Sequence, residues 1–430
     1  MGNADAIGWE GVFANQDREA MVEVARDVIE IPSETGFEGP IGDYVAERFG
    51  SLGGSVEFQE VEEGRNNVLA RFQMPEPGPT LLLIGHFDTS TNPDETYLPI
   101  GFHPKATLKD NWIYGLGISN MKCAFAGYYS ALQMLLDEGV PLRGEIIVAG
   151  LVGEIEKAPV DIWQGKRFRG GGAGARFMVH HGVTADFCIN GEPSGMRLQT
   201  GNAGYLFAKV SIKGVAQHTF SKEKAIDPIP KAFQVYDALQ KWELDYQERN
   251  PHPAMKLVTN VGAIFGGYPY KPSITAPDCS LYVHVNTLPG KSILSVKREL
   301  EQLMDTLSAT IDDFDASVEF YLASDGHYLE REHPLVQTVA SAHRTVHGSD
   351  VIWPDPVRLG GVSCDNSPMM EYGIPSVQYG AGGINLSGDY SMYEPGLGEV
   401  VNLDNLAMTS RVYAVSIADL LGSEGDAEAG

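Results

Sequence analysis

The sequence predicts an α/β fold in which a catalytic domain, with a mostly parallel sheet flanked by helices, carries an inserted α+β domain. In the first 200 residues, short apolar runs alternate with segments of helical periodicity, which is typical of βα units. Between residues 201 and 322 the order changes to β-α-β-β-α-β, which is typical of an antiparallel sheet. We therefore expect one domain formed by residues 1–200 and 323–430, and a second domain formed by residues 201–322.

The composition excludes several kinds of partner. The 430 residues are 43% hydrophobic, which suits a globular protein with a large core. Lys and Arg number 31 against 57 Asp and Glu, and the net charge of −26 disfavours nucleic acid and anionic membranes. No apolar run reaches the roughly 18 residues of a membrane span, and no signal-peptide pattern precedes residue 11. We expect a cytoplasmic protein whose scattered cysteines are free buried thiols: Cys123, Cys188, Cys279 and Cys364.

The elements before the first polar motif alternate between helix and strand. Apolar residues recur at helical spacing over 17–31 and 39–52, and the second helix is entered through Pro40. Strands are expected at 56–60 and 67–72, and the proline-rich segment 75–79 predicts a turn. The apolar run Leu81–Ile84 then predicts a buried parallel strand.

An irregular loop is expected at 93–110, and the same alternation follows it. The remaining helices of the main domain are expected at 121–137, 333–347 and 405–421, and its remaining strands at 144–151, 186–190 and 376–379. The inserted domain is expected to contain strands 203–213, 258–262, 278–286 and 317–322, and helices 227–248 and 291–311.

Four polar residues recur just past a strand end or at a helix start. They are His86, Asn120, Glu154 and Glu192, spaced by 34, 34 and 38 residues, about one βα unit each. Each has an ordinary explanation, since a His in H-x-D is more often structural and Asn120 is placed to cap a helix. Ligands of open α/β sheets bind beyond the carboxyl ends of the strands. The recurrence therefore predicts one shared crevice, with Asp88 placed to orient the imidazole of His86.

With these motifs, nearly the whole chain resembles the metal-dependent amidohydrolases and exopeptidases related to acetylornithine deacetylase, succinyl-diaminopimelate desuccinylase and aminoacylase. That family has the segments G-H-x-D, G-R-G-x-x-D-M-K, D-E-E and E-P, then a lid His and a C-terminal H-x-x-x-E. Their counterparts are Gly85–Asp88, Gly115–Lys122, Gly153–Glu156, Gly191–Pro193, Ala216–His218 and Glu394–Glu399.

The departures from the family pattern affect the second of its two metal ions. The bridging Asp of the family falls on Asn120, a second-metal Glu falls on Ile155, and no His lies near Glu394. The resemblance thus implies one divalent ion per subunit, held by His86, Asn120 and Glu192. Such a donor set favours Mn or Fe, with Zn possible.

The resemblance also assigns further roles. Glu154 matches the general base of the family, with Glu156 as the alternative. His218 matches the lid His, which in dimeric members reaches the active site of the partner subunit, so a homodimer through the lid is expected. Asn286 stands where the family commonly has an Arg that holds a substrate carboxylate, which makes an ordinary peptide tail doubtful.

These departures are similar to what an aminohydrolase branch of the family needs. That branch converts an aromatic amine, 5-nitroanthranilate, to 5-nitrosalicylate and ammonia, and the resemblance implies this reaction for the chain, with activated water as nucleophile. Two alternatives stay open: an N-deacylase or exopeptidase acting on a small amide, and an inactive relative that only binds a small molecule. Retention of Glu154 beside the metal ligands disfavours the inactive relative.

Overall fold

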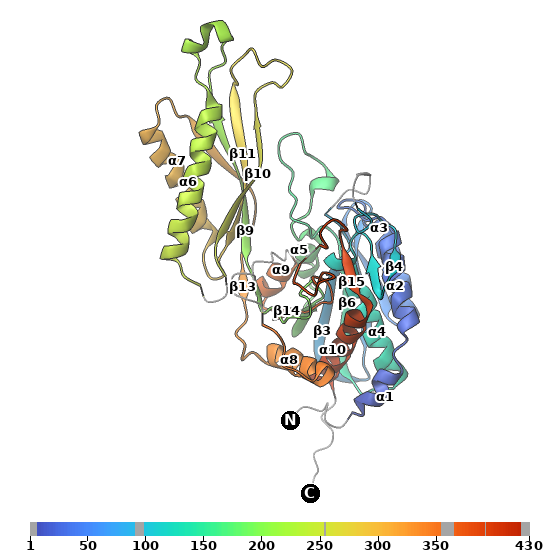
Figure 1. The fold of residues 1–430 in the computed structure, drawn as a ribbon. Helices are drawn as coiled ribbons and strands as arrows, with labels where there is room; N and C mark the ends of the chain where they lie inside the picture. The colour runs from blue at the N-terminus through green and yellow to red at the C-terminus, as the bar shows by residue number, and fades with distance from the viewer. Residues whose placement is uncertain (1–6, 91–98, 253–254, 354–364, 392, 423–430) are drawn as a thin grey trace. The chain divides into compact units, whose positions relative to one another are not determined.

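The computed structural model describes residues 7–90, 99–252, 255–353, 365–391 and 393–422 (Figure 1). These residues form two compact units. The first contains the described residues up to 201 together with 329–353 and 365–422, and the second contains the described residues of 202–328. The units divide after residues 201 and 328, whereas the sequence pattern placed the divisions after residues 200 and 322.

The first unit is built on a six-stranded mixed sheet in the order β1-β2-β6-β3-β7-β14. Its strands are β1 (Ser55–Glu62), β2 (Arg65–Gln73), β3 (Glu76–His86), β6 (Arg143–Leu151), β7 (Phe187–Asn190) and β14 (Ser376–Gln378). The last four are mutually parallel, whereas β1 and β2 are antiparallel additions at one edge. This confirms the predicted α/β class, with the parallel strands that carry the polar motifs together in the sheet.

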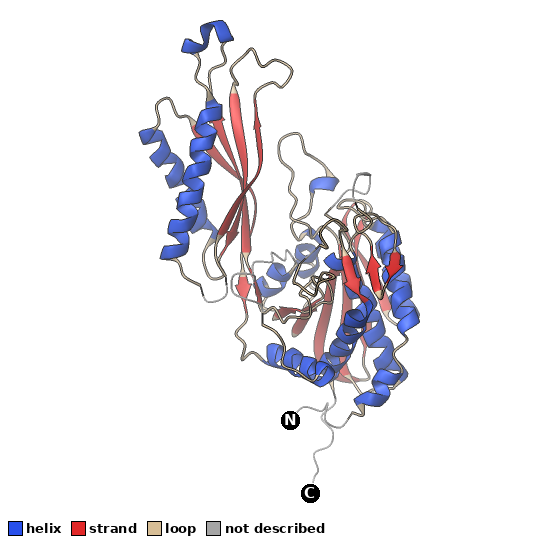
Figure 2. Ribbon diagram, in the orientation of Figure 1, coloured by secondary structure: helices blue, strands red, loops and turns tan. Residues whose placement is uncertain are grey.

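Helices cover both faces of this sheet (Figure 2). Side chains alternate along β3, so that Leu81 and Leu83 enter one core while Leu82 and Ile84 enter the other. The first core is closed by α2 (Arg18–Glu30), α3 (Gly39–Ser51), α4 (Cys123–Asp137), α8 (Pro334–His347) and α10 (Leu403–Leu421). The second is closed by α5 (Ala173–His180) and α9 (Asn366–Glu371). Burial on both faces explains why these strands are continuous apolar runs.

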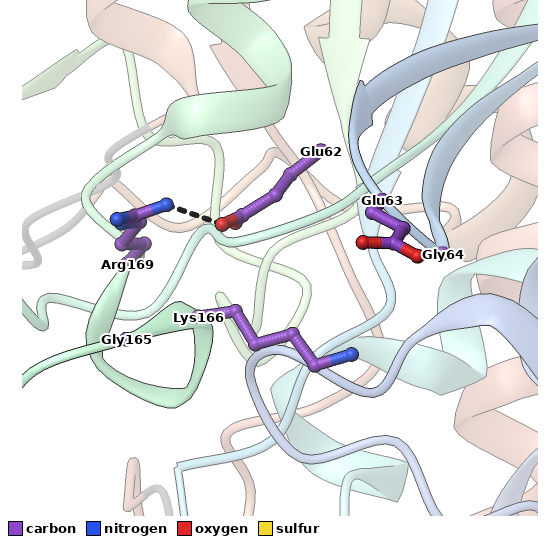
Figure 3. Close-up of a pocket in the computed structure, with 6 residues that line it drawn as sticks. All are labelled: Glu62, Glu63, Gly64, Gly165, Lys166 and Arg169. Atoms are coloured by element: carbon purple, nitrogen blue, oxygen red, sulfur yellow. Dashed lines mark hydrogen bonds and ion pairs between the residues drawn. The ribbon is translucent and has the colours of Figure 1, made fainter.

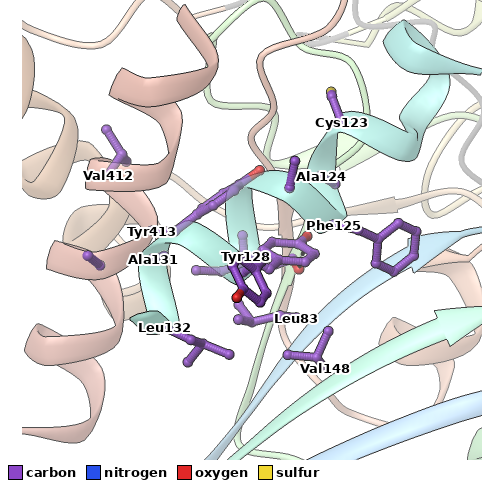
Figure 4. Packing of buried hydrophobic residues seen from close by; sticks show 14 of the residues in the cluster. Leu83, Cys123, Ala124, Phe125, Tyr128, Ala131, Leu132, Val148, Val412 and Tyr413 are labelled. Atoms are coloured by element: carbon purple, nitrogen blue, oxygen red, sulfur yellow. Dashed lines mark hydrogen bonds between the residues drawn. The ribbon is translucent and has the colours of Figure 1, made fainter. Parts of the chain in front are cut away.

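The larger core fixes the strand from which His86 emerges. Helices α4 and α10 pack against each other on this face of the sheet, and the rings of Tyr128 and Tyr413 lie 4.9 Å apart in this layer (Figure 4). The Tyr128 hydroxyl donates to the carbonyl oxygen of Ile84 at 2.8 Å. The polar end of a fully buried tyrosine therefore anchors β3 two residues before His86.

The second unit contains a four-stranded antiparallel sheet in the order β10-β11-β9-β12. Its elements are β9 (Gly204–Lys213), α6 (Pro228–Arg249), β10 (Val258–Gly266), β11 (Asp278–Thr287), α7 (Ile293–Thr310) and β12 (Ala316–Ser324). The β-α-β-β-α-β order is therefore confirmed. Apolar residues of α6 and α7 pack with alternate residues of β9 and β11 into a separate core.

Two predictions from local sequence pattern differ from the structure, one in a proline-rich segment and one where strands distant in the sequence pair. The turn expected at 75–79 is wrong, because β3 already begins at Glu76 and passes an irregular register before Thr80. The loop expected at 93–110 is partly wrong, since β4 (Thr107–Lys109) pairs with β5 (Trp112–Tyr114), and β15 (Val400–Asn402) completes that small sheet. Residues 91–98 of that loop lie outside the described chain.

The other elements are short. They are α1 (Trp9–Ala14), a π-helical turn η2 (Ile118–Lys122), the 3₁₀ turns η3 (Lys166–Phe168) and η4 (Thr219–Lys224), and strands β8 (Gly201–Asn202) and β13 (His327–Tyr328). Cys123, Cys188 and Cys279 are buried free thiols, and Cys364 lies outside the described residues. Within the described residues, no helix has the length and apolar character needed to cross a bilayer.

Candidate metal centre

Side chains from neighbouring strand ends of the first unit meet in one buried group. His86 ends β3, Glu154 follows β6 by three residues, and Glu192 follows β7 by two. One ligand atom from each of the three lies within 4.8 Å of the other two, and all three side chains are buried. Because these strands are adjacent and parallel, their carboxyl ends lie at the same edge of the sheet. The convergence expected from the spacing of the motifs is therefore present.

The imidazole of His86 is oriented for coordination through Nε2. Its Nδ1 lies 2.8 Å from the carbonyl oxygen of Asp88, so Nδ1 carries the proton in this hydrogen bond. Nε2 faces Asn120 Oδ1 at 3.0 Å, and Glu154 Oε2 and Glu192 Oε1 at 3.8 Å each. Asn120 therefore faces the imidazole, and the N-cap residue of the following helix α4 is Lys122, not Asn120.

Asp88 fixes the loop that bears Glu154. Its carboxylate accepts hydrogen bonds from the backbone N–H of Glu154 at 2.9 Å and of Ile155 at 3.2 Å, and from the Thr35 hydroxyl at 2.8 Å. Asp88 Oδ1 is also 3.5 Å from His86 Nδ1. Burial alone raises the pKa of Asp88, but these interactions outweigh it and leave the pKa below its ordinary value. The predicted orienting residue thus supports both His86 and Glu154.

A relay of amide groups holds Glu192. The backbone N–H of Glu192 donates to Asn190 Oδ1 at 3.2 Å, and Asn190 Nδ2 donates to Asn366 Oδ1 at 2.9 Å. Asn190 ends β7 and Asn366 begins α9, so a contact between residues 176 positions apart holds the backbone at Glu192.

Glu399 fixes the loop that bears Asn120. Its buried carboxylate accepts three backbone hydrogen bonds of 3.0 Å, from the N–H groups of Gly117, Ser119 and Asn120. Burial nevertheless raises the pKa of Glu399 to about 7. The sequence matched Glu399 to a family motif without giving it a task, because the contact joins residues about 280 positions apart.

The site carries an excess of buried acid. Burial, followed by the charge of Glu154, holds the pKa of Glu192 well above its ordinary value, and the same two causes raise the pKa of Asp365. Neither carboxylate oxygen of the fully buried Asp365 has a hydrogen-bond partner within the described chain. Burial alone lowers the pKa of His86, but Asp88, Glu154 and Glu192 outweigh it and raise the pKa well above its ordinary value.

This donor set fits a divalent cation. An imidazole nitrogen, carboxylate oxygens and an amide oxygen are ligands that suit Mn, Fe or Zn. A cation would also neutralise carboxylates that otherwise carry a large desolvation cost. Sequence analysis did not select Asp365 as a site residue, since the glycine-rich segment before it offered no ligand pattern; residues 360–364 of that segment lie outside the described chain.

The other residues expected at the site have contacts of their own. Ile155 donates its N–H to Asp88 and offers no ligand atom, while Glu394 accepts a hydrogen bond from the N–H of Leu386. Glu156, the alternative base, interacts electrostatically with Glu154: burial, followed by the charge of Glu154, raises the pKa of Glu156 to about 7. His218 belongs to the second unit, where it caps η4 and stacks on Phe220.

A separate surface pocket of the first unit contains no part of the proposed metal-ligand group. It is lined by Glu62, Glu63, Gly64, Gly165, Lys166 and Arg169 (Figure 3). Arg169 and Glu62 form an ion pair across it, so opposite charges compensate each other at the surface. None of its lining residues belongs to the His86 group.

Comparison with known sequences gives one family match and several distant relatives. The description "Peptidase family M20/M25/M40" matches residues 82–418. Acetylornithine deacetylase of Vibrio campbellii is 25% identical over 346 residues, covering 79% of this chain and 82% of the relative. Succinyl-diaminopimelate desuccinylase of Xanthobacter autotrophicus is 27% identical over 368 residues, covering 82% and 90%.

Solved structures share the fold at low sequence identity. A tripeptidase from Staphylococcus aureus superposes with a TM-score of 0.70 and 20% identity, covering 93% of this chain and 98% of that chain. A metallo-carboxypeptidase from Sulfolobus solfataricus gives 0.73 and 14%, covering 93% and 99%. A dinuclear metal-binding peptidase from Bacillus subtilis gives 0.64 and 14%, covering 94% and 98%.

Proposed function

The chain belongs to peptidase family M20/M25/M40 and is a metal-dependent hydrolase of carbon–nitrogen bonds, and we propose that it cleaves a small amide at a single divalent ion. The observation that carries the proposal is the buried group formed by His86, Glu154 and Glu192, with Nε2 of the imidazole turned into it. His86, Asn120 and Glu192 are the proposed metal ligands. Mn or Fe is the favoured ion, with Zn as a third candidate.

Glu154 is the proposed general base. A divalent ion, when bound, lowers the pKa of water and polarises the bond under attack. The Glu154 carboxylate accepts the proton that the attacking water loses and then delivers it to the leaving nitrogen. Asp88 supports this transfer by holding the backbone N–H of Glu154, which limits where the carboxylate can lie. The water oxygen ends in the new carboxylate, and the amine leaves with the transferred proton.

A single ion is proposed because the residues for a second one are missing. Ile155 has no donor atom, and the amide of Asn120 carries no charge with which to bridge two cations. The described residues contain one group of three His, Cys, Asp or Glu side chains with the spacing of a metal site. The peptidase from Bacillus subtilis is dinuclear by its own description, so this chain would differ from it in metal count.

Hydrolytic deamination of an aromatic amine is the second candidate. The sequence analysis favoured this reaction, with 5-nitroanthranilate as substrate, whereas the relatives that match the chain favour amide hydrolysis. The observation that keeps deamination open is the altered second-metal position at Asn120 and Ile155. In this reaction water adds to the amine-bearing ring carbon, the nitro group takes up the developing charge, and ammonia leaves with a proton from Glu154.

One assay separates the candidates. Purified protein loaded with Mn²⁺ is incubated with a panel of N-acyl amino acids and with 5-nitroanthranilate, and both acid release and ammonium release are measured. Acid release from an N-acyl substrate supports amide hydrolysis, and ammonium release with the colour change of the nitro compound supports deamination. Glu154→Gln is the matched control for contaminating activity. Failure of every substrate would leave the inactive-relative alternative as the better account.

A homodimer through the second unit is also proposed. Strand β10 lies at the edge of its sheet and exposes Ile264 and Phe265, and α6, which packs beside β10, exposes Phe233 and Leu244. Long edge strands with exposed apolar side chains pair readily with another chain. A second copy of this unit offers the same edge, which suits a two-fold symmetric contact. In this dimer His218 would serve the active site of the partner subunit.

A further inference from the structure

A buried arginine lies directly behind the loop that bears Glu154. Arg65 begins β2, and its side chain is the largest of the almost fully buried ones in the described chain, with 1% of its surface exposed. A charged group is rarely buried to this extent without partners, because its desolvation is costly. The partners of Arg65 therefore show which parts of the chain this cation holds.

The principal partner of Arg65 is the equally buried Glu38, which precedes α3. Arg65 Nη2 donates to Glu38 Oε1 at 2.6 Å, and Arg65 Nε donates to Glu38 Oε2 at 2.9 Å. Two such hydrogen bonds fix the orientation of both planar groups. Glu38 Oε2 also accepts the N–H of Gly36 at 3.0 Å, so the ion pair holds the segment between α2 and α3.

That segment supports the residues that follow β3. The Thr35 hydroxyl donates to Asp88 Oδ2 at 2.8 Å, and the Ser33 hydroxyl donates to the carbonyl oxygen of Phe87 at 2.7 Å. With its other oxygen, Asp88 accepts the backbone N–H of Glu154 at 2.9 Å. A path of hydrogen bonds through one short backbone segment therefore runs from the buried ion pair to the backbone of Glu154.

Arg65 also contacts the Glu154 loop directly. Gly153 precedes Glu154 with a φ of +67°, and a Cβ at this position would lie 2.7 Å from Arg65 Nη2. Arg65 Nη1 donates to the carbonyl oxygen of Arg169 at 3.0 Å, and that oxygen would lie 3.0 Å from the same Cβ. The backbone at Gly153 is thus enclosed by the guanidinium and by the chain at Arg169, so a glycine is required there.

The charge of Arg65 reaches Asp88 as well. Burial alone lowers the pKa of Arg65, but the hydrogen bonds and charge of Glu38, followed by Glu62 and Asp88, outweigh it and raise the pKa. The guanidinium therefore stays charged in the core, where it compensates part of the negative charge of Asp88.

We propose that Arg65 is a positioning residue of the metal centre, which sets the place of the base Glu154 and of the ligand His86. One path is the direct contact at the backbone that precedes Glu154. The other runs through the segment between α2 and α3 to Asp88, which holds both groups. The roles of base and ligand rest on the proposed function, whereas the support of the two loops by Arg65 does not depend on it.

Three variants interrupt this support at different points. Arg65→Met combined with Glu38→Gln removes both buried charges, so that no unpaired ion remains in the core. Thr35→Val keeps the shape of the side chain but removes the hydrogen bond to Asp88. Arg65→Lys keeps the charge but loses the paired hydrogen bonds. If the double variant fails to fold, Thr35→Val and Arg65→Lys decide by the same measurements.

Mn²⁺ affinity, measured by isothermal titration, is the first readout. Residues that orient metal ligands typically contribute about 10- to 100-fold in affinity. We expect about tenfold weaker binding in Thr35→Val and about 10- to 100-fold weaker binding in the double variant, with a smaller loss in Arg65→Lys. Because both changes act through Asp88, their combination should weaken binding by less than the product of the separate effects. Arg71→Met, which removes another arginine of β2 from its ion pair with Glu145, should leave the affinity unchanged.

Hydrogen–deuterium exchange of the metal-free protein is the second readout, and it needs neither a metal nor a substrate. The amides of Glu154 and Ile155 donate to Asp88, so they should exchange faster in Thr35→Val and in the double variant. A general loss of stability would instead raise exchange throughout the first unit. Melting temperature and circular dichroism verify that each variant is folded.

Two results would overturn the proposal. One is unchanged Mn²⁺ affinity together with unchanged exchange of Glu154 and Ile155 in the folded variants. The other is an equal loss of affinity in Arg71→Met, because the effect would then follow the loss of any arginine on β2. If the unmodified protein binds no Mn²⁺, the proposed function is wrong and the exchange measurement alone decides about Arg65. With an active substrate, the double variant should lower kcat more than it raises KM, since the base would be displaced.

Discussion

The two largest sheets of the described chain have opposite kinds of unsatisfied edge. At the carboxyl ends of β3, β6 and β7 in the first unit, ionisable side chains are buried and held by the backbone and by one another. At strand β10 in the second unit, the apolar side chains of Ile264 and Phe265 are more than half exposed. At the first edge ionisable groups are buried, which costs desolvation energy, and at the second edge apolar side chains are exposed to water.

Each edge carries an energetic cost that a bound partner would offset. Buried carboxylates around one imidazole are costly unless a cation compensates them. An exposed apolar edge strand is costly in a different way, because it favours association with another strand. A divalent ion would complete the first edge and a second copy of the chain would complete the other. The following experiments test each requirement separately.

Removal of the metal should have the largest effect. Dialysis against a chelator is expected to abolish turnover, and titration with Mn²⁺ should restore it at about one ion per subunit, since one ligand group is present among the described residues. Elemental analysis of protein purified without chelator gives the count. The dimer should persist in the chelated protein, because β10 contributes nothing to the ligand group. Two ions per subunit, both required, would contradict the single-ion proposal.

Loss of the proposed base should have the next largest effect. Glu154→Gln keeps the shape of the side chain but removes proton transfer, so kcat should fall by about 10²–10⁴-fold, with metal content and substrate affinity largely retained. Glu156→Gln is the matched control two residues away and should cost much less. If Glu156→Gln is the inactive variant instead, the assignment of the two acids is reversed. If both variants stay active, the general-base mechanism itself fails.

Charge placed on the β10 edge should break the dimer and leave the metal centre unchanged. Phe265→Lys replaces an exposed aromatic side chain with a cation on both copies of the proposed contact, so dimer dissociation should rise at least about tenfold. Analytical ultracentrifugation across a concentration series measures this. Lys209→Ala, a polar change on β9 within the same sheet, is the control. An unmodified protein that is monomeric and active at assay concentration would refute the dimer.

A carboxylate in place of Asn120 should have a moderate effect on metal binding. Asn120→Asp adds a negative charge 3.0 Å from His86 Nε2 and should tighten Mn²⁺ binding while changing turnover. The second-metal position still has Ile155, so the count should stay near one ion per subunit. Isothermal titration of the variant and the unmodified protein compares the affinities. Unchanged affinity together with unchanged turnover would reject Asn120 as a ligand.

The smallest expected effect is on stability as a function of pH. Burial raises the pKa of Glu156 and of Glu399 from 4.5 to about 7. A carboxyl group whose pKa is higher in the folded state stabilises the fold below the unfolded pKa, and that contribution is lost as pH rises through the folded pKa. The melting temperature of the metal-free protein should therefore fall between about pH 4.5 and pH 7.

Two additions sharpen the pH experiment. Mn²⁺ should recover stability at pH 7, because the cation compensates the ionised acids. Glu156→Gln removes one titrating group and should flatten the profile of the metal-free protein. A profile that is already flat in the unmodified metal-free protein would contradict the assignment of these two groups.

Local sequence pattern determined the elements and the placement of the principal site residues. The apolar runs before His86, Glu154 and Glu192 are buried on both faces, so their strand character is visible without any knowledge of the partner strands. The β-α-β-β-α-β order of the second unit is likewise a local property. The spacing of the motifs therefore predicted that these three residues meet beyond the ends of parallel strands, whereas the expectation of a metal ion came from the resemblance to a family.

Tertiary structure alone decided how those residues are held. The three hydrogen bonds to Glu399 join segments about 280 residues apart, and no periodicity records such contacts. Asn120 had the sequence context of a helix cap, yet its amide faces His86 because the backbone at that residue is not helical. Periodicity reports which side of an element is buried; the groups that meet there are set by how distant elements pack.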